Sequence, residues 1–268
     1  MKIGFLGLGN MGGPLAQRLL LRQALYVYDL RPSAMEALAA LGATPVTSPR
    51  ALAELCDVIM TCLPTSAHVE HALFGHDGIV AGCAARDTYR RHDHGDPTVT
   101  RRMAAMLAAE HGIDMVDAPV SGGPRGAKAG TIAIMVGASD ALLSRVQPLF
   151  EMISPNVFHC GGIGTGHVMK LINNVIHAGQ KALTFEALAV GVRNGLSLQA
   201  CVNVLNKASG RNFTTETNLQ SMADGTMVST FTLALMHKDV ALATQLGRET
   251  GVPHARSRIL CAKCTRLA

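Results

Sequence analysis

The first thirty residues restrict the fold more than any other part of the sequence. Residues 2–6 form a short apolar run typical of a buried strand, and residues 14–21 carry apolar side chains at helical spacing. Between them lies a G-x-G-x-x-G turn made of Gly7, Leu8, Gly9, Asn10, Met11 and Gly12. In such a turn the first glycine permits the tight bend, the second leaves room for a pyrophosphate, and the third lets the helix approach the strand. The segment therefore predicts a dinucleotide-binding unit.

An acidic residue follows this turn at the distance that dinucleotide-binding units require. The apolar run at residues 24–28 ends in Asp29, about twenty residues after the glycines. Its carboxylate can accept hydrogen bonds from the ribose hydroxyls of NAD and would repel the 2′-phosphate of NADP. Asp29 therefore favours NAD. Arg31, two residues further on, can soften this preference, so NADP stays open as the alternative cofactor.

Strand and helix patterns alternate up to about residue 160. Apolar runs recur at residues 44–46, 57–62, 113–120 and 130–138, with helical periodicity between them, and Ser48 and Ser66 are placed to cap two of the helices. The alternation predicts an α/β fold with a doubly wound, mainly parallel sheet. From residue 167 onward the periodicity is helical. We therefore expect a nucleotide-binding domain over residues 1–163 and an all-α domain over residues 164–268.

Several candidate residues follow predicted strands, at the sheet edge where doubly wound folds bind ligands. Leu63 and Pro64 come after the run at 57–62 and are expected to line the cofactor site. Ser121, Gly122 and Gly123 follow the run at 113–120. Their hydroxyl and backbone N–H groups suit a carboxylate cradle, and a flexible turn is the equal alternative.

Two lysines lie inside apolar helical stretches. Lys170 has only apolar neighbours in the chain, and Asn174 follows one helical turn later. Burial disfavours the ammonium form, so we expect a lowered pKa for Lys170 and a role as general acid/base. Asn174 can hold a substrate hydroxyl or carboxylate. Lys238, beside Asp239, either faces an anionic substrate or the nicotinamide side, or forms an inter-helix salt bridge.

Composition argues against several functions. The net charge is +5, and paired arginines occur only at 90–91 and 101–102, which is too sparse for nucleic acid but suits a small anionic ligand. No apolar run reaches membrane-spanning length and no secretory signal is recognisable, so we expect a cytoplasmic protein. Cys261 and Cys264 form a C-x-x-C without a second pair, so no metal is expected.

Four ordered stretches together resemble the β-hydroxyacid dehydrogenases, a family that includes 3-hydroxyisobutyrate dehydrogenase and tartronate semialdehyde reductase. They are GFLGLGNMG, DAPVSGG, GTGHVMKLINN and the pair Lys238-Asp239, and the resemblance runs from Met1 to about Pro253. It implies a Rossmann-like domain followed by a helical domain, in a homodimer or homotetramer. It also implies that Lys170 is the catalytic acid/base, that Ser121–Gly123 and Asn174 hold the substrate, and that Lys238 lines the cofactor–substrate site.

The resemblance implies NAD-dependent interconversion of a short β-hydroxy acid and its semialdehyde. The stretch SGRNF, residues 209–213, resembles the 3-hydroxyisobutyrate branch. Tartronate semialdehyde reductase is one alternative. A nucleotide-binding protein with impaired catalysis is a second alternative. A nucleic-acid-binding protein that uses the basic stretches is the least favoured.

The stretch TYRRHDHGDP, residues 88–97, departs from the family pattern, which implies a buried strand and a cofactor-contacting threonine here. Adjacent strand residues point to opposite faces, so His92, Asp93 and His94 chelate a metal poorly. One codon choice for residues 90–94, read one base later, encodes Val-Asp-Met-Thr, which restores the expected strand and turn. Residues 254–268 also depart from the family pattern, and a permitted codon choice for them, read in a shifted frame, encodes a sequence that resembles the family's last helix. We hypothesise two reading-frame shifts. We therefore expect the first segment to loop out of the sheet or to weaken it.

Overall fold

The computed structural model describes residues 1–83, 88–91, 95–227 and 232–252. The chain divides into two compact units, Met1–Lys170 and Leu171–Ala268, and each is considered by itself. Among the described residues, no helix is both long enough and apolar enough to cross a membrane.

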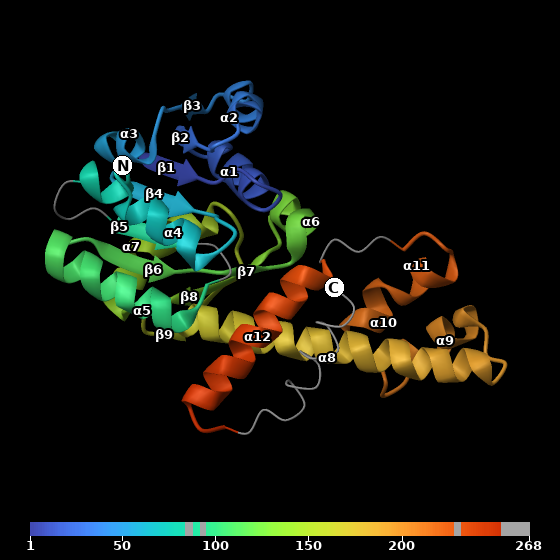
Figure 1. Cartoon of the computed structure of the whole chain (residues 1–268). Helices are drawn as coiled ribbons and strands as arrows, with labels where there is room; N and C mark the ends of the chain where they lie inside the picture. Colours follow the sequence, from blue (N-terminus) through green and yellow to red (C-terminus); the bar gives the residue numbers. More distant parts are fainter. Residues whose placement is uncertain (84–87, 92–94, 228–231, 253–268) are drawn as a thin grey trace. The chain divides into compact units, whose positions relative to one another are not determined.

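A mainly parallel sheet runs through the first unit (Figure 1), in the strand order β3-β2-β1-β4-β5-β6-β8-β7 with β9 paired to β8. The strands β1 to β6 pair in parallel, β8 is antiparallel to β6 and β7, and β9 is parallel to β8. The predicted doubly wound, mainly parallel sheet is confirmed. The strands are β1 Ile3–Leu6, β2 Leu25–Tyr28, β3 Thr44–Pro45, β4 Val58–Thr61, β5 Thr88–Arg91, β6 Asp114–Asp117, β7 Val120–Ser121, β8 Ala133–Gly137 and β9 Val157–Gly161.

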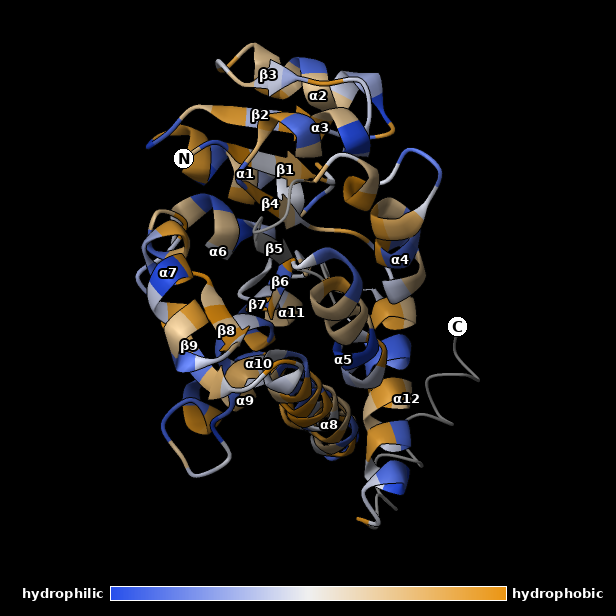
Figure 2. Ribbon diagram, turned by 90° about the vertical axis from the view of Figure 1, so that its left-hand side faces the viewer, coloured by the Kyte–Doolittle hydropathy of each residue, from blue (hydrophilic) through white to orange (hydrophobic). Residues whose placement is uncertain are grey.

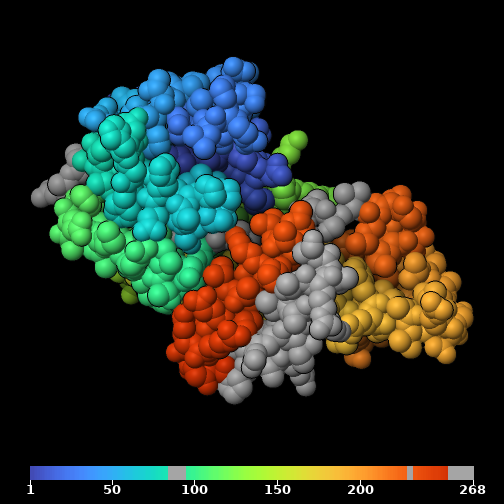
Figure 3. Space-filling model, viewed as in Figure 1, coloured from blue at the N-terminus to red at the C-terminus, as the bar shows by residue number. Residues whose placement is uncertain are grey.

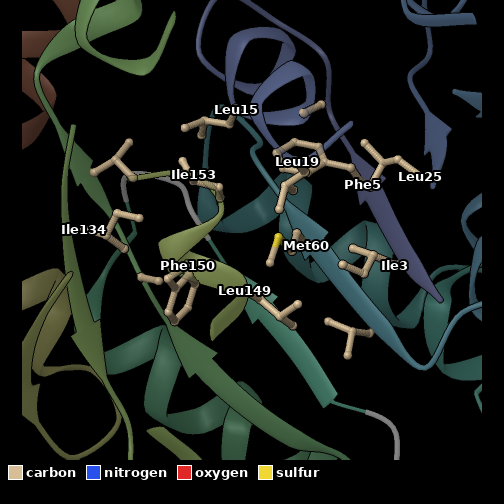
Figure 4. Packing of buried hydrophobic residues seen from close by; sticks show 14 of the residues in the cluster. Ile3, Phe5, Leu15, Leu19, Leu25, Met60, Ile134, Leu149, Phe150 and Ile153 are labelled. Carbon is tan, nitrogen blue, oxygen red and sulfur yellow. The ribbon is translucent and has the colours of Figure 1, made fainter. Parts of the chain in front are cut away.

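Helices cover both faces of this sheet, and each face has its own apolar core. On one face, side chains from β1, α1, β4 and α7 meet in a single cluster that includes Phe5, Met60 and Phe150 (Figure 4). On the other face, α3, α4 and α5 pack on β4 and β6, and Figure 3 shows α4 and α5 as part of the outer surface. The helices are α1 Gly12–Leu20, α2 Pro32–Ala39, α3 Pro49–Leu55, α4 Ser66–Phe74, α5 Pro97–Met106, α6 Gly123–Ala129 and α7 Asp140–Glu151, with the single turns η1 Ile79–Ala81 and η2 Leu107–His111.

Side-chain hydrogen bonds cap the first turns of two of these helices, α3 and α4. Ser48 caps α3 as predicted, because its Oγ accepts a hydrogen bond from the N–H of Ala51 at 3.1 Å. The prediction that Ser66 caps α4 is wrong. Thr65 is the cap of α4, since its Oγ1 accepts from the N–H of His68. The hydroxyl of Ser66 instead accepts from the N–H of Asp96 at 3.1 Å, which ties α4 to the start of α5.

The unusual stretch contributes a central strand. Thr88–Arg91 forms β5, and all four residues pair in parallel register with both β4 and β6. The expectation that this segment loops out of the sheet is therefore wrong for these residues. Loss of a central strand would leave the backbone groups of two neighbouring strands without partners, which opposes looping out whatever the side chains are. Residues 92–94 lie outside the described part of the chain.

The second unit is helical in all its described elements. The long helix α8, Thr165–Arg193, begins in the first unit and carries apolar and polar residues around its circumference (Figure 2). It is followed by α9 Leu198–Leu205, α10 Phe213–Thr217, α11 Leu219–Ala223 and α12 Leu233–Glu249. Two small apolar clusters, one around Leu188 and Leu219 and one around Ala178 and Val240, hold these helices together. The last helix expected over residues 254–268 lies outside the described residues.

The position of β5 leads to a stability prediction. Met60 and Val116, in register with Arg90 on the two neighbouring strands, are fully buried, so this position of the sheet suits an apolar residue. We expect Arg90→Val to raise the free energy of unfolding by about 1 kcal/mol or more, seen as an increase of roughly 2–4 °C in Tm by calorimetry. Arg22→Val, at an exposed position, is the control and should not raise Tm. A lower Tm for Arg90→Val would contradict the reading-frame hypothesis, which sequencing of the gene checks directly.

Candidate active site

The glycine-rich turn joins β1 to α1 and is shaped by close packing at two of its three glycines. Gly7 has a φ of +92°, and a Cβ there would overlap the carbonyl oxygen of Cys62. A Cβ at Gly12 would overlap the carbonyl oxygen of Gly7. At Gly9, by contrast, the nearest atom to an added Cβ is an Arg31 guanidinium nitrogen at 4.0 Å. The second glycine therefore leaves an open approach to the backbone, which fits the phosphates of a dinucleotide.

Asp29 follows β2 and is tied to this turn by backbone hydrogen bonds. Its Oδ2 accepts from the N–H of Leu8 at 2.7 Å, and its Oδ1 accepts from the N–H and the Nε of Arg31 at 2.9 and 3.2 Å. Burial would raise the pKa of Asp29, but these hydrogen bonds and the positive charge of Arg31 outweigh burial and hold the pKa below its usual value. The side chain keeps 11% of its surface exposed, so the ionised carboxylate can still accept from a ligand.

The other residues predicted to bind the cofactor lie around the same turn. Leu8 is buried beneath it, Asn10 is exposed at its tip, and Met11 directly precedes α1. Leu63 lies after β4, with its side chain 3.0 Å from the position of an added Cβ on Gly7, and Pro64 beside it is exposed. The structure thus brings the predicted cofactor residues of the first unit together at the carboxyl ends of β1, β2 and β4.

The predicted carboxylate cradle lies at the junction of β7 and α6. Ser121 is the last residue of β7, and Gly123 is the first residue of α6. Gly122 and Gly123 have φ values of +137° and +64°, which L side chains rarely adopt. No atom lies within 4 Å of an added Cβ at Gly123, so space is open beside this turn.

Lys170 lies in the second turn of α8, and its side chain is only 6% exposed. The start of α8 is held by Asp117, the last residue of β6. The carboxylate of Asp117 accepts hydrogen bonds from the N–H groups of Gly164 and His167 at 2.6 and 2.7 Å. The sequence analysis did not identify this role of Asp117. The signal that could have found it is an acidic residue at the end of a buried strand.

The predicted site residues of the second unit form a polar cluster of their own. Asn174 is 5% exposed, and its Nδ2 donates to Oδ2 of the fully buried Asp239 at 2.6 Å. The Nδ2 of Asn173 donates to Oδ1 of Asn174 at 3.0 Å. Lys238 lies with its Nζ 3.8 Å from Oδ1 of Asp239, its neighbour in α12. The structure therefore joins Asn174 and Lys238 through one carboxylate.

Among the described residues, no group of three or more His, Cys, Asp or Glu side chains is arranged to hold a metal ion. Cys261 and Cys264 lie outside the described part of the chain.

Two family models match nearly the whole chain. The NAD binding domain of 6-phosphogluconate dehydrogenase matches residues 2–162, and the NAD-binding domain of NADP-dependent 3-hydroxyisobutyrate dehydrogenase matches residues 164–265. The second match continues beyond Pro253, where we expected the resemblance to end.

Individual proteins agree with these family models. The chain is 38% identical to 2-(hydroxymethyl)glutarate dehydrogenase of Eubacterium barkeri, over 94% of this chain and 84% of that protein. It is 40% identical to NAD-dependent L-serine dehydrogenase of Pseudomonas aeruginosa, over 80% of this chain and 72% of that protein. The structure of Mycobacterium tuberculosis 3-hydroxyisobutyrate dehydrogenase with L-serine superposes with a TM-score of 0.90 at 31% identity, covering 100% of this chain and 93% of that one. As its motifs indicated, the chain belongs to the β-hydroxyacid dehydrogenase family of NAD-dependent oxidoreductases.

Proposed function

We propose that this protein oxidises the primary hydroxyl group of a short β-hydroxy acid, such as 3-hydroxyisobutyrate, to the semialdehyde, and that Lys170 is the general acid/base. The named substrates of the three relatives share one structure, a hydroxymethyl group on the carbon atom that carries the carboxylate. The observation that carries the proposal is the burial of Lys170 one helical turn before Asn174 in α8.

Oxidation requires removal of the hydroxyl proton and of a hydride from the same carbon. NAD, when bound, supplies the hydride acceptor. Lys170 takes the hydroxyl proton on Nζ, which requires its neutral form, and burial of the side chain favours that form. In the reductive direction the lysine returns this proton to the oxygen. A positioned acid/base of this kind typically contributes about 10²–10⁴-fold to the rate.

The remaining predicted residues position the substrate. The amide of Asn174 is oriented by Asp239 and Asn173, and an amide so held can offer its second N–H and a second lone pair of Oδ1 to a substrate hydroxyl. We propose that the turn at Ser121–Gly123 holds the substrate carboxylate and that Lys238 adds positive charge. Such positioning supplies a large share of the rate in an oxidoreductase that relies on a cofactor.

A second candidate is tartronate semialdehyde reduction, which uses the same residues in the reverse direction. A third is nucleotide binding with impaired catalysis, favoured by His-Asp-His at residues 92–94, where the family resemblance implies a cofactor-contacting threonine. Turnover of any β-hydroxy acid would exclude the third.

We also propose a homodimer or homotetramer in a reducing, cytoplasmic compartment. Three large apolar side chains spaced seven residues apart on α8, Ile176, Leu183 and Val190, are exposed, and a stripe of this kind marks a surface that packs against another helix. Among the described residues, the cysteines at 56, 62, 83, 160 and 201 form no disulfide bond, which fits a reducing environment.

The substrate class leads to a first prediction. With NAD, we expect 3-hydroxyisobutyrate, L-serine and 2-(hydroxymethyl)glutarate to give higher kcat/KM than 2-hydroxy acids such as lactate. In the first three the hydroxyl group lies one carbon further from the carboxylate, and we propose that the cradle and Lys170 are spaced for that separation. Steady-state assays of the purified protein, following NADH absorbance, test this. Preference for a 2-hydroxy acid would contradict the proposed substrate class.

Lys170 can be tested by removal. Lys170→Ala should lower kcat by about 10²–10⁴-fold and leave the Kd for NAD nearly unchanged, because the dinucleotide turn and Asp29 lie elsewhere in the first unit. Lys181→Ala is the matched control, since Lys181 is a partly buried lysine of the same helix whose pKa is lowered by burial. We expect it to retain turnover. Wild-type kcat in Lys170→Ala would show that Lys170 is structural.

Cofactor preference follows from Asp29. We expect kcat/KM to be higher with NAD than with NADP, because the ionised carboxylate repels a 2′-phosphate. Asp29→Asn should lower the ratio of kcat/KM with NAD to kcat/KM with NADP. Arg31→Ala should raise the ratio of kcat/KM with NAD to kcat/KM with NADP, because it removes a cation beside Asp29 that could bind the phosphate. A higher kcat/KM with NADP in the unmodified protein would mean that Arg31 dominates the adenosine site.

A further inference from the structure

A fully buried polar cluster lies beneath the start of α8, within the first unit. It consists of Asp117 from the end of β6, His167 from the first turn of α8, and Thr100 from α5, all with no exposed surface. Nδ1 of His167 lies 3.2 Å from Oδ2 of Asp117 and 3.2 Å from Oγ1 of Thr100. The three elements therefore meet at the imidazole of His167.

The hydrogen bonds of the cluster indicate which of its atoms donate and which accept. The hydroxyl of Thr100 donates its single proton to the carbonyl oxygen of Asp96 at 2.8 Å, so towards His167 it can only accept. Asp117, as a carboxylate, also only accepts. A proton on Nδ1 of His167 satisfies both acceptors, and the two contacts hold the imidazole in one orientation.

Asp117 replaces a local helix cap. The residue before α8 is Gly164, which has a φ of +87° and no side chain to accept from the first N–H groups of the helix. Asp117, 47 and 50 residues earlier in the chain, accepts from Gly164 and from His167 instead. A negative charge at a helix N-terminus is also favoured by the helix dipole.

The surrounding backbone is shaped to admit this carboxylate. A Cβ on Gly137, opposite Asp117 in β8, would overlap Oδ1 of Asp117. A Cβ on Gly166 would lie 2.8 Å from Oδ2 of Asp117 and would overlap the carbonyl oxygen of Met135. The carboxylate thus fits tightly, and displacement of Asp117 displaces the first turn of α8 with it.

We propose that Asp117 is a positioning residue for the reaction, acting with Thr100 through His167 to fix the place of Lys170. Lys170 lies three residues after His167 in the same helix, so the position of the first turn sets the position of its Nζ. The strand that ends at Asp117 leads within four residues to Ser121–Gly123. The carboxylate therefore fixes the start of the helix that carries the acid/base, and its own strand leads into the proposed substrate cradle. The proposal rests on the role of Lys170 proposed above.

Asp117→Asn tests this role with little change in shape. The amide offers one oxygen to two N–H donors, so its NH₂ group must face one of them and the first turn of α8 must shift. Because displacement of a catalytic group by about 1 Å can cost on the order of 10²-fold, we expect kcat to fall by about 10–10²-fold. The Kd for NAD should stay within about twofold, because the dinucleotide turn is held by Asp29.

A double-variant cycle distinguishes positioning from a general structural effect. In the Lys170→Ala background, Asp117→Asn should change the residual rate by less than about twofold, because no lysine is left to be misplaced. An Asp117→Asn effect that persists in full in this background, or wild-type kcat in Asp117→Asn alone, would overturn the proposal. Wild-type kcat in Lys170→Ala alone would overturn the proposed function instead.

Thr100 supplies a second test if Asp117→Asn fails to fold. Thr100→Val removes one of the two acceptors beside Nδ1 of His167 and should lower kcat, whereas Thr100→Ser keeps the hydroxyl and should retain the unmodified kcat. Ser197→Ala is the control for lost capping, because Ser197 caps α9 through the N–H of Ala200 at 3.1 Å. It should lower Tm without lowering kcat. Equal kcat in Thr100→Val and the unmodified protein would contradict the proposal.

Discussion

The buried carboxylate of Asp117 is the interaction on which the organisation of the proposed site depends. An unpaired charge inside a protein is strongly unfavourable, so Asp117 is tolerated only because two N–H groups of Gly164 and His167 and the imidazole of His167 surround it. The same contacts satisfy N–H groups that a helix start leaves without partners. The N–H groups thus offset the unfavourable burial of the carboxylate, and the carboxylate satisfies the N–H groups. The result is a fixed junction between the end of β6 and the start of α8.

A second aspartate shows how burial separates a structural role from a binding role. Asp29 follows β2 just as Asp117 ends β6, and each accepts a hydrogen bond from a backbone N–H group. The donor is Leu8 of the glycine-rich turn in one case and His167 of the first turn of α8 in the other. Asp29 retains 11% of its side-chain surface, and its pKa is held low by Arg31 and by backbone N–H groups. It can therefore serve a ligand. Asp117 has no exposed surface and serves only the protein.

Most of the fold could be predicted from the sequence because its signals are local. The glycine turn, the acid at Asp29 and the cap at Ser48 each act within one βα unit, and the structure has them as expected. The strand β9 was missed because it has an exposed Phe158 and no continuous apolar run. The helix α6 was missed because its sequence, GPRGAKA, is typical of a turn. In both cases the pairing or packing that stabilises the element comes from distant residues.

The same distinction explains why the site was only partly predictable. Lys170 and Asn174 stand out as polar residues in an apolar helix, so their positions alone indicate them. The partners of Asp117 lie 47 and 50 residues away, and no periodicity connects them. In the strand β5, by contrast, the charged local sequence does not favour a central strand, and pairing with β4 and β6 determines that these residues form one. Because two neighbouring strands present their backbone groups to whatever segment lies between them, the sheet selects a strand there even against side-chain preference.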